Sequence, residues 1–302
     1  MFLHSLKMAW WNVSMSPASN KAASKGNTNT HKQLFDNLMF LFSKYDMAVI
    51  ALCEVSSTDI VALDTHFQKS PFQVLDLTFK AGKTRFDTAI IYNKDLVFIE
   101  HQYDLKNEIR SQTIKAGQKI LLTEKMNMDE FTLILCHWAS KISQSGLEKR
   151  LKSGTILYEE AKELMNNNKQ VIIMGDFNDN PYDESLFRKL NATRCYESVR
   201  RHPTELLYNP FWRNIVSNIQ YNYTKADQVS FPSGSHRYRD PFGEIWHSYD
   251  QILFSGNFLG FSAWHLNEPQ TKVIEDTNFL DMLLCSKTIF DHLPVMCEIT
   301  RP

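Results

Sequence analysis

The stretch IIMGDFNDNP, residues 172–181, places a carboxylate and a carboxamide directly after an apolar run. Residues 171–174 are typical of a buried strand, and Gly175 would let the backbone turn where that strand ends. In an extended segment the side chains of Asp176 and Asn178 point to the same side. The carboxylate could then hold a water or a cation while the carboxamide donates to an anion. That combination suits phosphate-ester hydrolysis, although Gly, Asp and Asn also form ordinary turns.

Other polar side chains stand at the ends of apolar runs in the same way. They are Asn12 after AWW, Glu54 after IALC, His137 after LILC, Asp176 after IIMG, Asp250 before QILF, and Asp291 with His292 before LPV. Strand ends that share one rim of a sheet sandwich would bring these groups together. Each also has a structural alternative: Asn12 could cap a turn, Glu54 could cap a helix, and His137 could be a satisfied core histidine.

A hard cation explains why these groups would occur together. Mg²⁺ prefers one or two carboxylates and keeps several waters, which Glu54 with help from Asn12 or Asp291 could supply, and Mn²⁺ is a possible substitute. Hydrolysis also needs a water held in line with the phosphorus, and Asp176 is suited to holding it.

The remaining polar groups fit the phosphate. Asn178, His137 and His292 could donate to the charge that builds up on phosphorus. Each histidine then needs a carboxylate that orients its ring. We expect Asp250 to serve His292 and Asp87, in RFDTAIIY, to serve His137.

The composition predicts a soluble, cytoplasmic globular protein. The 302 residues are 43% apolar, which is enough for a substantial core. No window approaches eighteen apolar residues and no secretory signal is recognisable, so no transmembrane association is expected. Four of the five cysteines lie in or beside apolar runs, and no CxxC pair suggests a zinc site. The net charge of −1 argues against a protein that coats nucleic acid by bulk electrostatics, but a locally basic groove is compatible with it.

The hydrophobic pattern predicts the elements that would position these groups. Strands are expected at 6–13, 47–53, 72–79, 88–92, 96–103, 111–122, 131–137, 171–174, 252–254 and 293–299, and helices at 31–45, from Ser56 or Ser57 to Phe67, and at 147–165. Residues 14–30 are expected to form a mobile loop, and the strands between 72 and 137 an antiparallel meander. Mixed sheets covered by helices fit this order. We therefore predict an α/β fold in which two packed mixed or antiparallel sheets, flanked by helices, form a four-layer sandwich.

The segment 196–249 differs from the rest of the chain. It is rich in aromatic residues and arginine, and Pro and Gly interrupt it without clear periodicity. We interpret it as an excursion over the site, within a single domain that spans residues 1–302. A monomer is assumed.

The order and identity of these polar strand ends resemble those of the endonuclease/exonuclease/phosphatase (deoxyribonuclease I-like) superfamily. The matching pieces are WN at 11–12, CEV around Glu54, HWAS at 137–140, GDFND at 175–179, SYDQILFS around Asp250 and FDHLPV around His292. They follow the order of that superfamily across nearly the whole chain. HWAS differs from the HWPS of many uncharacterised bacterial members at Ala139, and the segments LYNPFW and SHRYRDPFGEIWHSYDQ resemble the same proteins.

The resemblance implies the four-layer sandwich and a divalent-metal-dependent phosphoesterase. It places Asn12 and Glu54 near the metal, Asp176 at the attacking water, and Asn178 and His292 at the phosphate. No motif specific for inositol phosphates and no apolar hairpin for a membrane-bound substrate is present.

Three functions stay open. The first is a nuclease on DNA, favoured over RNA, because basic and aromatic residues cluster around the expected rim. The candidates for substrate binding are Arg85, Asp87, Trp138, Ser140, Lys141, Arg237, Tyr238 and Arg239. Any one such cluster could equally be a solvated face. The second is a phosphatase or phosphodiesterase on a small-molecule or lipid head-group phosphate, with a closed pocket. The third is a non-catalytic scaffold that binds a partner.

Overall fold

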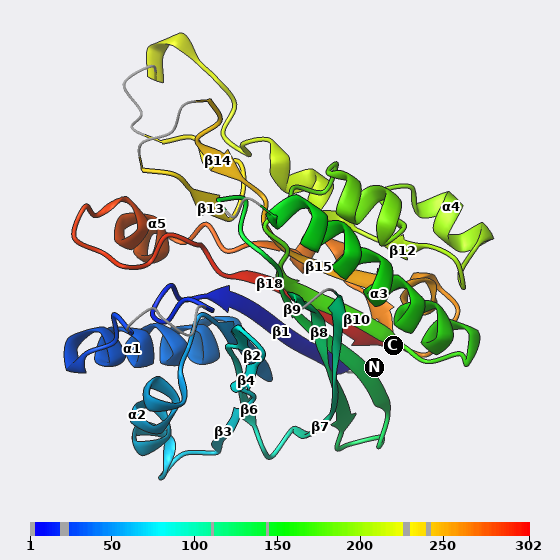
Figure 1. Ribbon diagram of the computed structural model, residues 1–302, viewed down its shortest axis with the longest axis horizontal. Coiled ribbons are helices and arrows are strands. Elements are labelled where there is room, and N and C mark those ends of the chain that lie inside the picture. Colours follow the sequence, from blue (N-terminus) through cyan, green and yellow to red (C-terminus); the bar gives the residue numbers. More distant parts are fainter. Residues whose placement is uncertain (1–3, 19–23, 110–111, 143–144, 226–229, 240–242) are drawn as a thin grey trace.

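Two large β-sheets pack face to face, with helices on their outer sides, in the computed structural model (Figure 1). The structure describes residues 4–18, 24–109, 112–142, 145–225, 230–239 and 243–302. Helices α1 and α2 lie beside the first sheet, and α3 and α4 lie beside the second (Figure 1). This arrangement confirms the predicted four-layer α/β sandwich.

The first sheet is mixed. Its strand order is β16–β18–β1–β2–β6–β3, and β17 also pairs with β18. Only the β1–β2 pair is parallel among these described strands, and its register sets Asn12 opposite Cys53. The bounds are β1 His4–Asn12, β2 Val49–Cys53, β3 Phe72–Asp76, β6 Thr88–Asn93, β16 His265–Leu266, β17 Lys272–Val273 and β18 Val295–Arg301.

The second sheet is also mixed. Its strand order is β11–β12–β15–β10–β9–β8–β7, with parallel pairing at β9–β10 and at β11–β12. The bounds are β7 Val97–Ile109, β8 Gln112–Glu124, β9 Glu130–His137, β10 Val171–Asp176, β11 Ala192–Thr193, β12 Leu207–Tyr208 and β15 Asp250–Ser255. Two small ribbons complete the strands: β4 Phe79–Ala81 with β5 Thr84–Phe86, and β13 His236–Arg237 with β14 Trp246–His247.

Helices α1 and α2 begin at residues whose side chains cap them. Asn27 caps α1 and Ser56 caps α2, each in a reciprocal capping box, and Ser56 is one of the two predicted caps. The α-helices are α1 Thr28–Tyr45, α2 Ser57–Phe67, α3 Gly146–Asn166, α4 Tyr196–Arg201 and α5 Thr277–Leu284. Shorter turns are the π-helix η1 Ser185–Lys189 and the 3₁₀ turns η2 Pro210–Ile215, η3 Tyr223–Lys225, η4 Gly256–Leu259 and η5 Glu268–Gln270. Within the described ranges, no helix combines the length and the apolar character needed to cross a bilayer.

The predicted meander between 72 and 137 is wrong as a single unit. β3 and β6 belong to the first sheet, whereas β7, β8 and β9 form an antiparallel run in the second. The chain passes from one sheet to the other between Asn93 and Val97. Strand alternation reports a buried face but not which sheet that face belongs to, so the pattern could not reveal the crossing.

The predicted loop at 14–30 is also only partly right. Residues 19–23 lie outside the described residues, and α1 already begins at Thr28. The start of the segment is buried: Ser14 and Ser16 are each at most 3% exposed, and the Ser16 N–H donates to the Glu54 carbonyl. Polar composition suggested exposure, but these serines are satisfied by internal hydrogen bonds.

The segment 196–249, outside its undescribed residues 226–229 and 240–242, contributes to the fold in two ways. Its first part supplies β12 to the second sheet and buries Val199, Tyr208 and Phe211. Its later part forms the β13–β14 ribbon, and His236 in β13 makes an isolated β-bridge with His292. This bridge brings the ribbon to the rim where the polar strand ends lie.

Candidate active site

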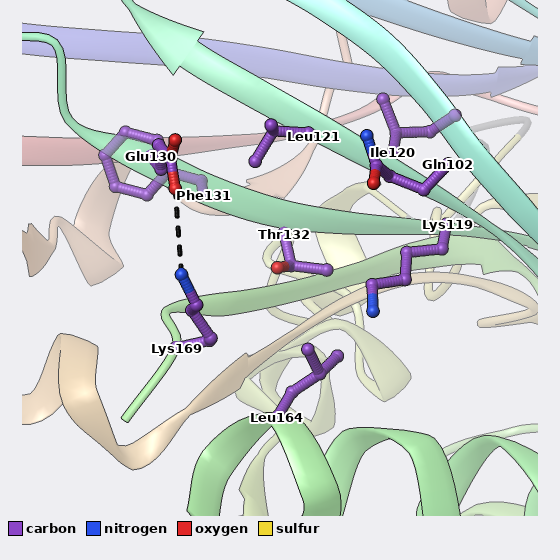
Figure 2. A pocket seen from close by; sticks show the side chains of 9 residues that line it. All are labelled: Gln102, Lys119, Ile120, Leu121, Glu130, Phe131, Thr132, Leu164 and Lys169. Carbon is purple, nitrogen blue, oxygen red and sulfur yellow. Dashed lines mark ion pairs between the residues drawn. The ribbon is translucent and has the colours of Figure 1, made fainter. Parts of the chain in front are cut away.

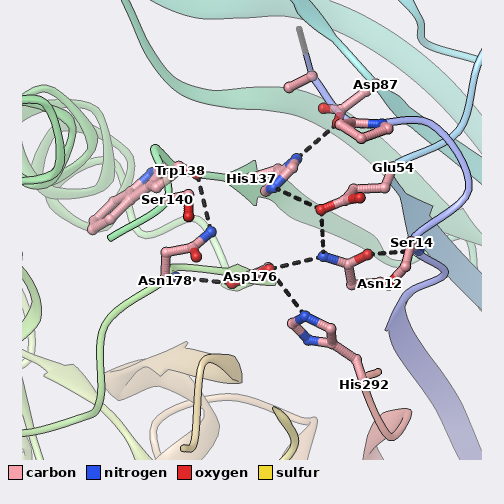
Figure 3. A network of polar contacts seen from close by, with 12 residues as sticks. Asn12, Ser14, Glu54, Asp87, His137, Trp138, Ser140, Asp176, Asn178 and His292 are labelled. Carbon is pink, nitrogen blue, oxygen red and sulfur yellow. Dashed lines mark hydrogen bonds and ion pairs between the residues drawn. The ribbon is translucent and has the colours of Figure 1, made fainter. Parts of the chain in front are cut away.

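The strand register gathers the predicted polar groups at one rim. Asp176 at the end of β10 is paired with His137 at the end of β9 on one side and with Asp250 at the start of β15 on the other. Asn12 ends β1, and Glu54 directly follows β2. The ends of both sheets therefore face each other across the site, as Figure 3 shows.

Gly175 serves this rim differently from the expectation. It lies inside β10 rather than at a turn, and a Cβ atom added there would sit 2.2 Å from the Cys136 carbonyl oxygen. The close approach of β9 and β10 at this point thus requires glycine. Because that approach fixes the neighbouring residues, Asp176 and His137 are held side by side.

Asn12 bridges two carboxylates. Its Nδ2 donates to Glu54 Oε1 at 3.2 Å and to Asp176 Oδ2 at 2.9 Å, while its Oδ1 accepts from the Ser14 N–H at 2.9 Å (Figure 3). Glu54 adopts a left-handed backbone conformation, with φ of 57°. As placed, Asn12 acts as a donor that spaces Glu54 and Asp176, and its oxygen is directed to the backbone.

His137 forms the first carboxylate–histidine pair. Its Nδ1 lies 2.8 Å from Asp87 Oδ2, the partner predicted from the sequence, and its Nε2 lies 3.9 Å from Glu54 Oε1. Burial by itself would lower the pKa of His137, but the buried Asp87 and Asp176 carboxylates raise that pKa to about 9. Lys115 Nζ lies 3.5 Å from the other Asp87 oxygen. The ring is therefore a cation at neutral pH.

His292 forms the second pair. Its Nδ1 lies 2.6 Å from Asp250 Oδ2, again the predicted partner, and its Nε2 lies 3.9 Å from Asp176 Oδ2. Burial lowers the pKa of His292, whereas Asp250, Asp176 and Asp291 together raise it to about 10. Trp10 Nε1 donates to Asp250 Oδ1 at 3.0 Å and the Ser235 hydroxyl donates to Oδ2 at 2.7 Å. Three donors thus converge on the Asp250 carboxylate.

Asp176 lies between the two pairs and is 1% exposed. Burial and the neighbouring Asp250 raise the pKa of Asp176 to about 6, against the opposing influence of His292 and His137. A carboxyl group with a pKa in this range can exchange a proton with a reacting water near neutral pH. Perturbed carboxyl groups of this kind gather at functional sites.

Asn178 departs from the extended geometry that the spacing suggested. Its φ of 52° is left-handed, and its N–H donates to Asp176 Oδ1 at 2.8 Å. The side-chain Nδ2 donates to the Trp138 carbonyl at 3.2 Å (Figure 3). The carboxamide is consequently placed beside Asp176 by a local Asx turn and by the residue after β9.

Asp291 and His236 complete the rim on the His292 side. The Ser14 hydroxyl donates to Asp291 Oδ1, and the Asp291 side chain is still 39% exposed. The His236 ring centroid lies 4.4 Å from that of His292, and His236 Nε2 lies 4.0 Å from Asp291 Oδ2. Burial and the nearby His292 lower the pKa of His236 to about 3, so this ring is neutral.

Several of these contacts were not foreseen from the sequence. His236 was not among the predicted site residues, and neither were the supporting donors Trp10, Ser14, Ser235 and Lys115. The available signals were the AWW run before Asn12 and the SGSHRYR stretch before β14. Neither motif indicates which distant strand end its polar atoms reach.

The candidates for substrate binding fall into different places. Ser140 is exposed near His137, and Lys141 pairs with Asp183 at 3.0 Å and lies 3.5 Å from Asp179. Arg85 donates to the Ser16 and Pro17 carbonyls, and the Trp138 ring is buried, with its indole N–H on the Ala116 carbonyl. These contacts give both side chains a structural role.

The three candidates from the β13 region also diverge. Tyr238 packs edge-on against His236, with 4.5 Å between ring centroids. Arg239 donates to the Ser286 and Thr288 carbonyls. Arg237 lies in β13, and its Nε is buried without a hydrogen-bond partner among the described atoms. Tyr238 thus contacts His236, and the Arg237 N–H donates to the Asp291 carbonyl at 3.3 Å, so both lie beside residues that border His292.

The donor set fits a hard divalent cation. Glu54 keeps 21% of its side chain exposed and lies beside Asp176 across Asn12, so carboxylate oxygens are available at the rim. Oxygen ligands of this type suit Mg²⁺ or Mn²⁺. Two other groups of acidic and histidine side chains could each hold an ion, Asp176–Asp250–His292 and His236–Asp291–His292. Asp250 is the least suited of these groups because its oxygens already accept from three donors.

A family model described as the endonuclease/exonuclease/phosphatase family matches residues 15–282. The chain belongs to this family. Members of the endonuclease/exonuclease/phosphatase family are hydrolases that act on phosphoester bonds and are typically dependent on divalent metals. The match includes Glu54, His137, Asp176 and Asp250, whereas Asn12, Asp291 and His292 lie outside it.

Solved structures of this family share the fold with the chain. A family protein from Bacteroides thetaiotaomicron is 17% identical with a TM-score of 0.60, and 100% of each chain is covered. A mannosyl-6-phosphatase from the same organism is 16% identical, with a TM-score of 0.56 over 97% of this chain and 99% of that one. TDP2 from D. rerio, complexed with single strand DNA product, is 14% identical with a TM-score of 0.54, and 98% of each chain is covered. No curated protein matches the sequence.

Proposed function

We propose that this protein is a divalent-metal-dependent nuclease that hydrolyses phosphodiester bonds in nucleic acid, with DNA favoured over RNA. The observation that carries the proposal is the position of Asp176 between two carboxylate–histidine pairs, Asp87–His137 and Asp250–His292. One carboxylate with a raised pKa, flanked by two imidazolium rings, suits in-line attack of a water on phosphorus.

Each group has a proposed role. Asp176 holds the attacking water and accepts its proton, because its pKa of about 6 lies close to neutrality. His292 and His137, both cationic, donate to the non-bridging or leaving oxygens, and Asp250 and Asp87 fix which ring nitrogen faces the substrate. Asn178 adds a neutral donor beside Asp176.

Glu54 is the proposed principal ligand of Mg²⁺, with Asn12 holding its carboxylate and Asp291 as the second candidate ligand. When bound, the metal would polarise a phosphoryl oxygen and offset the charge that develops there. The exposed fraction of Glu54 leaves this carboxylate accessible to the ion and its waters.

A phosphatase or phosphodiesterase on a small-molecule or lipid head-group phosphate is the second candidate. The same rim would serve such a substrate. The structural similarity to a mannosyl-6-phosphatase supports this candidate, just as the similarity to TDP2 complexed with single strand DNA product supports a nuclease. The two candidates differ in how many phosphates contact the protein. Binding to a nucleic-acid strand should therefore weaken steeply with salt, whereas a single phosphate releases few counterions.

A substrate panel with wild type and Asp176→Asn tests the proposal. Plasmid DNA, single-stranded DNA, RNA, a sugar phosphate and bis-para-nitrophenyl phosphate would be compared in Mg²⁺. We expect cleavage of DNA by wild type and a loss of turnover of about 10³-fold or more in the variant, in the range of general acid–base catalysis. The matched control is Asp281→Asn, which changes an exposed carboxylate on α5 and should leave turnover intact. Retained activity in Asp176→Asn would remove the site assignment.

A further inference from the structure

A cavity of about 470 Å³ opens beside the rim on the His137 side. Glu54 and His137 line one part of it, and Lys83, Lys115 and Lys149 line the remainder together with Ser140. The proposed metal ligand and one of the proposed phosphate donors therefore share a wall with three lysines. We call this cavity the lysine pocket.

The lysine pocket carries an excess of positive charge. Glu54 is the only acidic residue among the described residues that line it. Lys115 is engaged, because its Nζ donates to the Arg85 carbonyl and lies 3.5 Å from Asp87. Lys83 and Lys149 make no ion pair with any residue in the described part of the chain. Two ammonium groups thus stay available to an anion that enters the pocket.

A second cavity shows that lysines in the lining do not by themselves indicate a phosphate-binding site. The cavity in Figure 2, about 210 Å³, lies against β8, β9 and the end of α3 and also has two lysines in its lining. There Lys119 pairs with Glu160 at 2.9 Å and Lys169 with Glu130 at 3.7 Å. Those charges are neutralised by protein carboxylates, and none of the proposed catalytic residues lines that cavity.

We propose that the lysine pocket binds the phosphate that neighbours the scissile phosphate in a nucleic-acid strand. This inference rests on the proposed nuclease function. It places the neighbouring phosphate on the His137 side of the site. With the scissile phosphate at Glu54 and His137, the next phosphate along the strand enters the pocket and meets the ammonium groups of Lys83 and Lys149. Lysine and hydroxyl side chains commonly make phosphate contacts of this kind.

Binding to an inactive protein tests the pocket without requiring turnover. In the Asp176→Asn background, the affinity for a labelled five-nucleotide single-stranded DNA is measured by fluorescence anisotropy over a range of salt. Replacing both lysines, Lys83→Ala with Lys149→Ala, should raise the Kd about tenfold or more. For one lost phosphate contact, the slope of log Kd against log salt should fall by about 0.7.

The control removes the same number of charges elsewhere. Lys152 pairs with Glu148 on the same helix as Lys149 and does not line the pocket, and Lys169 lines the distant cavity. The pair Lys152→Ala with Lys169→Ala should change the Kd less than about twofold. An equal loss in both double variants would show bulk attraction to charge and overturn the proposal, as would an unchanged Kd in the pocket variant.

Uncharged linkages in the oligonucleotide identify which of its phosphates enters the lysine pocket. A methylphosphonate next to the scissile position should weaken binding to the protein with both lysines, and should cost little more once Lys83 and Lys149 are absent, because the two changes remove the same contact. Additive losses would contradict the proposal. Equally strong competition by inorganic pyrophosphate would reassign the pocket to a small bisphosphorylated ligand.

The double lysine variant made in the protein with Asp176 intact separates this inference from the proposed function. Hydrolysis of bis-para-nitrophenyl phosphate has no neighbouring phosphate, so it should not change in the double lysine variant. Absence of that hydrolysis in the protein with Asp176 intact would contradict the nuclease proposal, while the binding results would still decide the pocket.

Discussion

The two carboxylate–histidine pairs are alike in geometry but are anchored in different ways. Asp250 accepts from Trp10, Ser235 and His292, which come from β1, the segment before β13 and the segment before β18. Asp87 accepts from His137, while its other oxygen has no hydrogen-bond partner in the described residues and depends on the charge of Lys115 at 3.5 Å. Besides its histidine, Asp250 is held by two neutral donors, Trp10 and Ser235, whereas Asp87 is held by the charge of Lys115.

This difference gives Asp250 a larger part in the stability of the fold than Asp87. The Asp250 network ties the two sheets together, since Trp10 lies in the first sheet and Asp250 in the second. Asp87 contacts His137 and Lys115, which line the lysine pocket together with Glu54, where the metal and the substrate are proposed to bind. The Asp250–His292 pair thus joins the two sheets in addition to the proposed role of His292 at the phosphate, whereas the Asp87–His137 pair borders the lysine pocket.

Removing the two carboxylates gives the largest expected contrast. Asp250→Ala leaves three buried donors without their acceptor and should lower the free energy of unfolding by about 3–5 kcal/mol. Asp87→Ala leaves the His137 N–H unpaired, while Lys115 keeps the Arg85 carbonyl, and should cost roughly 1–3 kcal/mol. Urea denaturation at pH 7 measures both. Equal losses would refute the difference in anchoring.

Alkaline pH should weaken the two pairs one after the other. Both histidines have a folded-state pKa above the usual value near 6.5, about 9 for His137 and about 10 for His292. Their stabilisation is therefore fully present below about pH 6.5 and is lost as the pH rises through about 9 and then about 10. Urea denaturation between pH 6 and 10.5, in EDTA, should show this fall.

The variant His137→Gln assigns the steps of that pH profile. It should remove the part of the decline near pH 9 and leave the part near pH 10. A profile that keeps its shape in the variant would mean that His137 is not cationic in the folded protein.

The Mg²⁺ requirement for activity should change more when the carboxylate beside His137 is replaced than when the carboxylate beside His292 is replaced. Glu54→Gln removes a carboxylate charge 3.9 Å from His137 Nε2 and should raise the Mg²⁺ concentration for half-maximal activity by about tenfold or more. Asp291→Asn, beside His292, should shift that concentration less if Glu54 is the principal ligand. The reverse order would make Asp291 the main ligand.

The smallest expected effect concerns one donor within the Asp250 network. Ser235→Ala removes a hydroxyl that donates to Asp250 Oδ2 and accepts from the Asp250 N–H, and should cost roughly 1–2 kcal/mol. Trp10 and His292 still hold the carboxylate, so turnover should change little. A large loss of turnover without a loss of stability would assign Ser235 a direct role in the reaction.

Local pattern was sufficient for much of the fold and for the polar strand ends. Periodicity predicted α1, α2 and α3 within a few residues, and Ser56 was one of the two predicted caps of α2. Apolar runs predicted β2, β9 and β10, because strands buried on both faces read as continuous hydrophobic segments. The polar residue at the end of each run was thereby marked as a rim residue.

The pairing of Asp250 with His292 and of Asp87 with His137 was predicted from chemical need and is present in the structure. The resemblance to the family supplied the order of the motifs across the chain. The roles of those residues in a reaction stay a proposal, which the Asp176→Asn experiment tests.

The sequence by itself determined which side chains end the strands, because residue type and period are local properties of the chain. Tertiary structure alone decided that β3 and β6 belong to a different sheet from β7, that Asn12 donates between two carboxylates, and that His236 reaches His292. These outcomes depend on contacts between residues far apart in sequence. No local pattern encodes which distant backbone a strand will pair with.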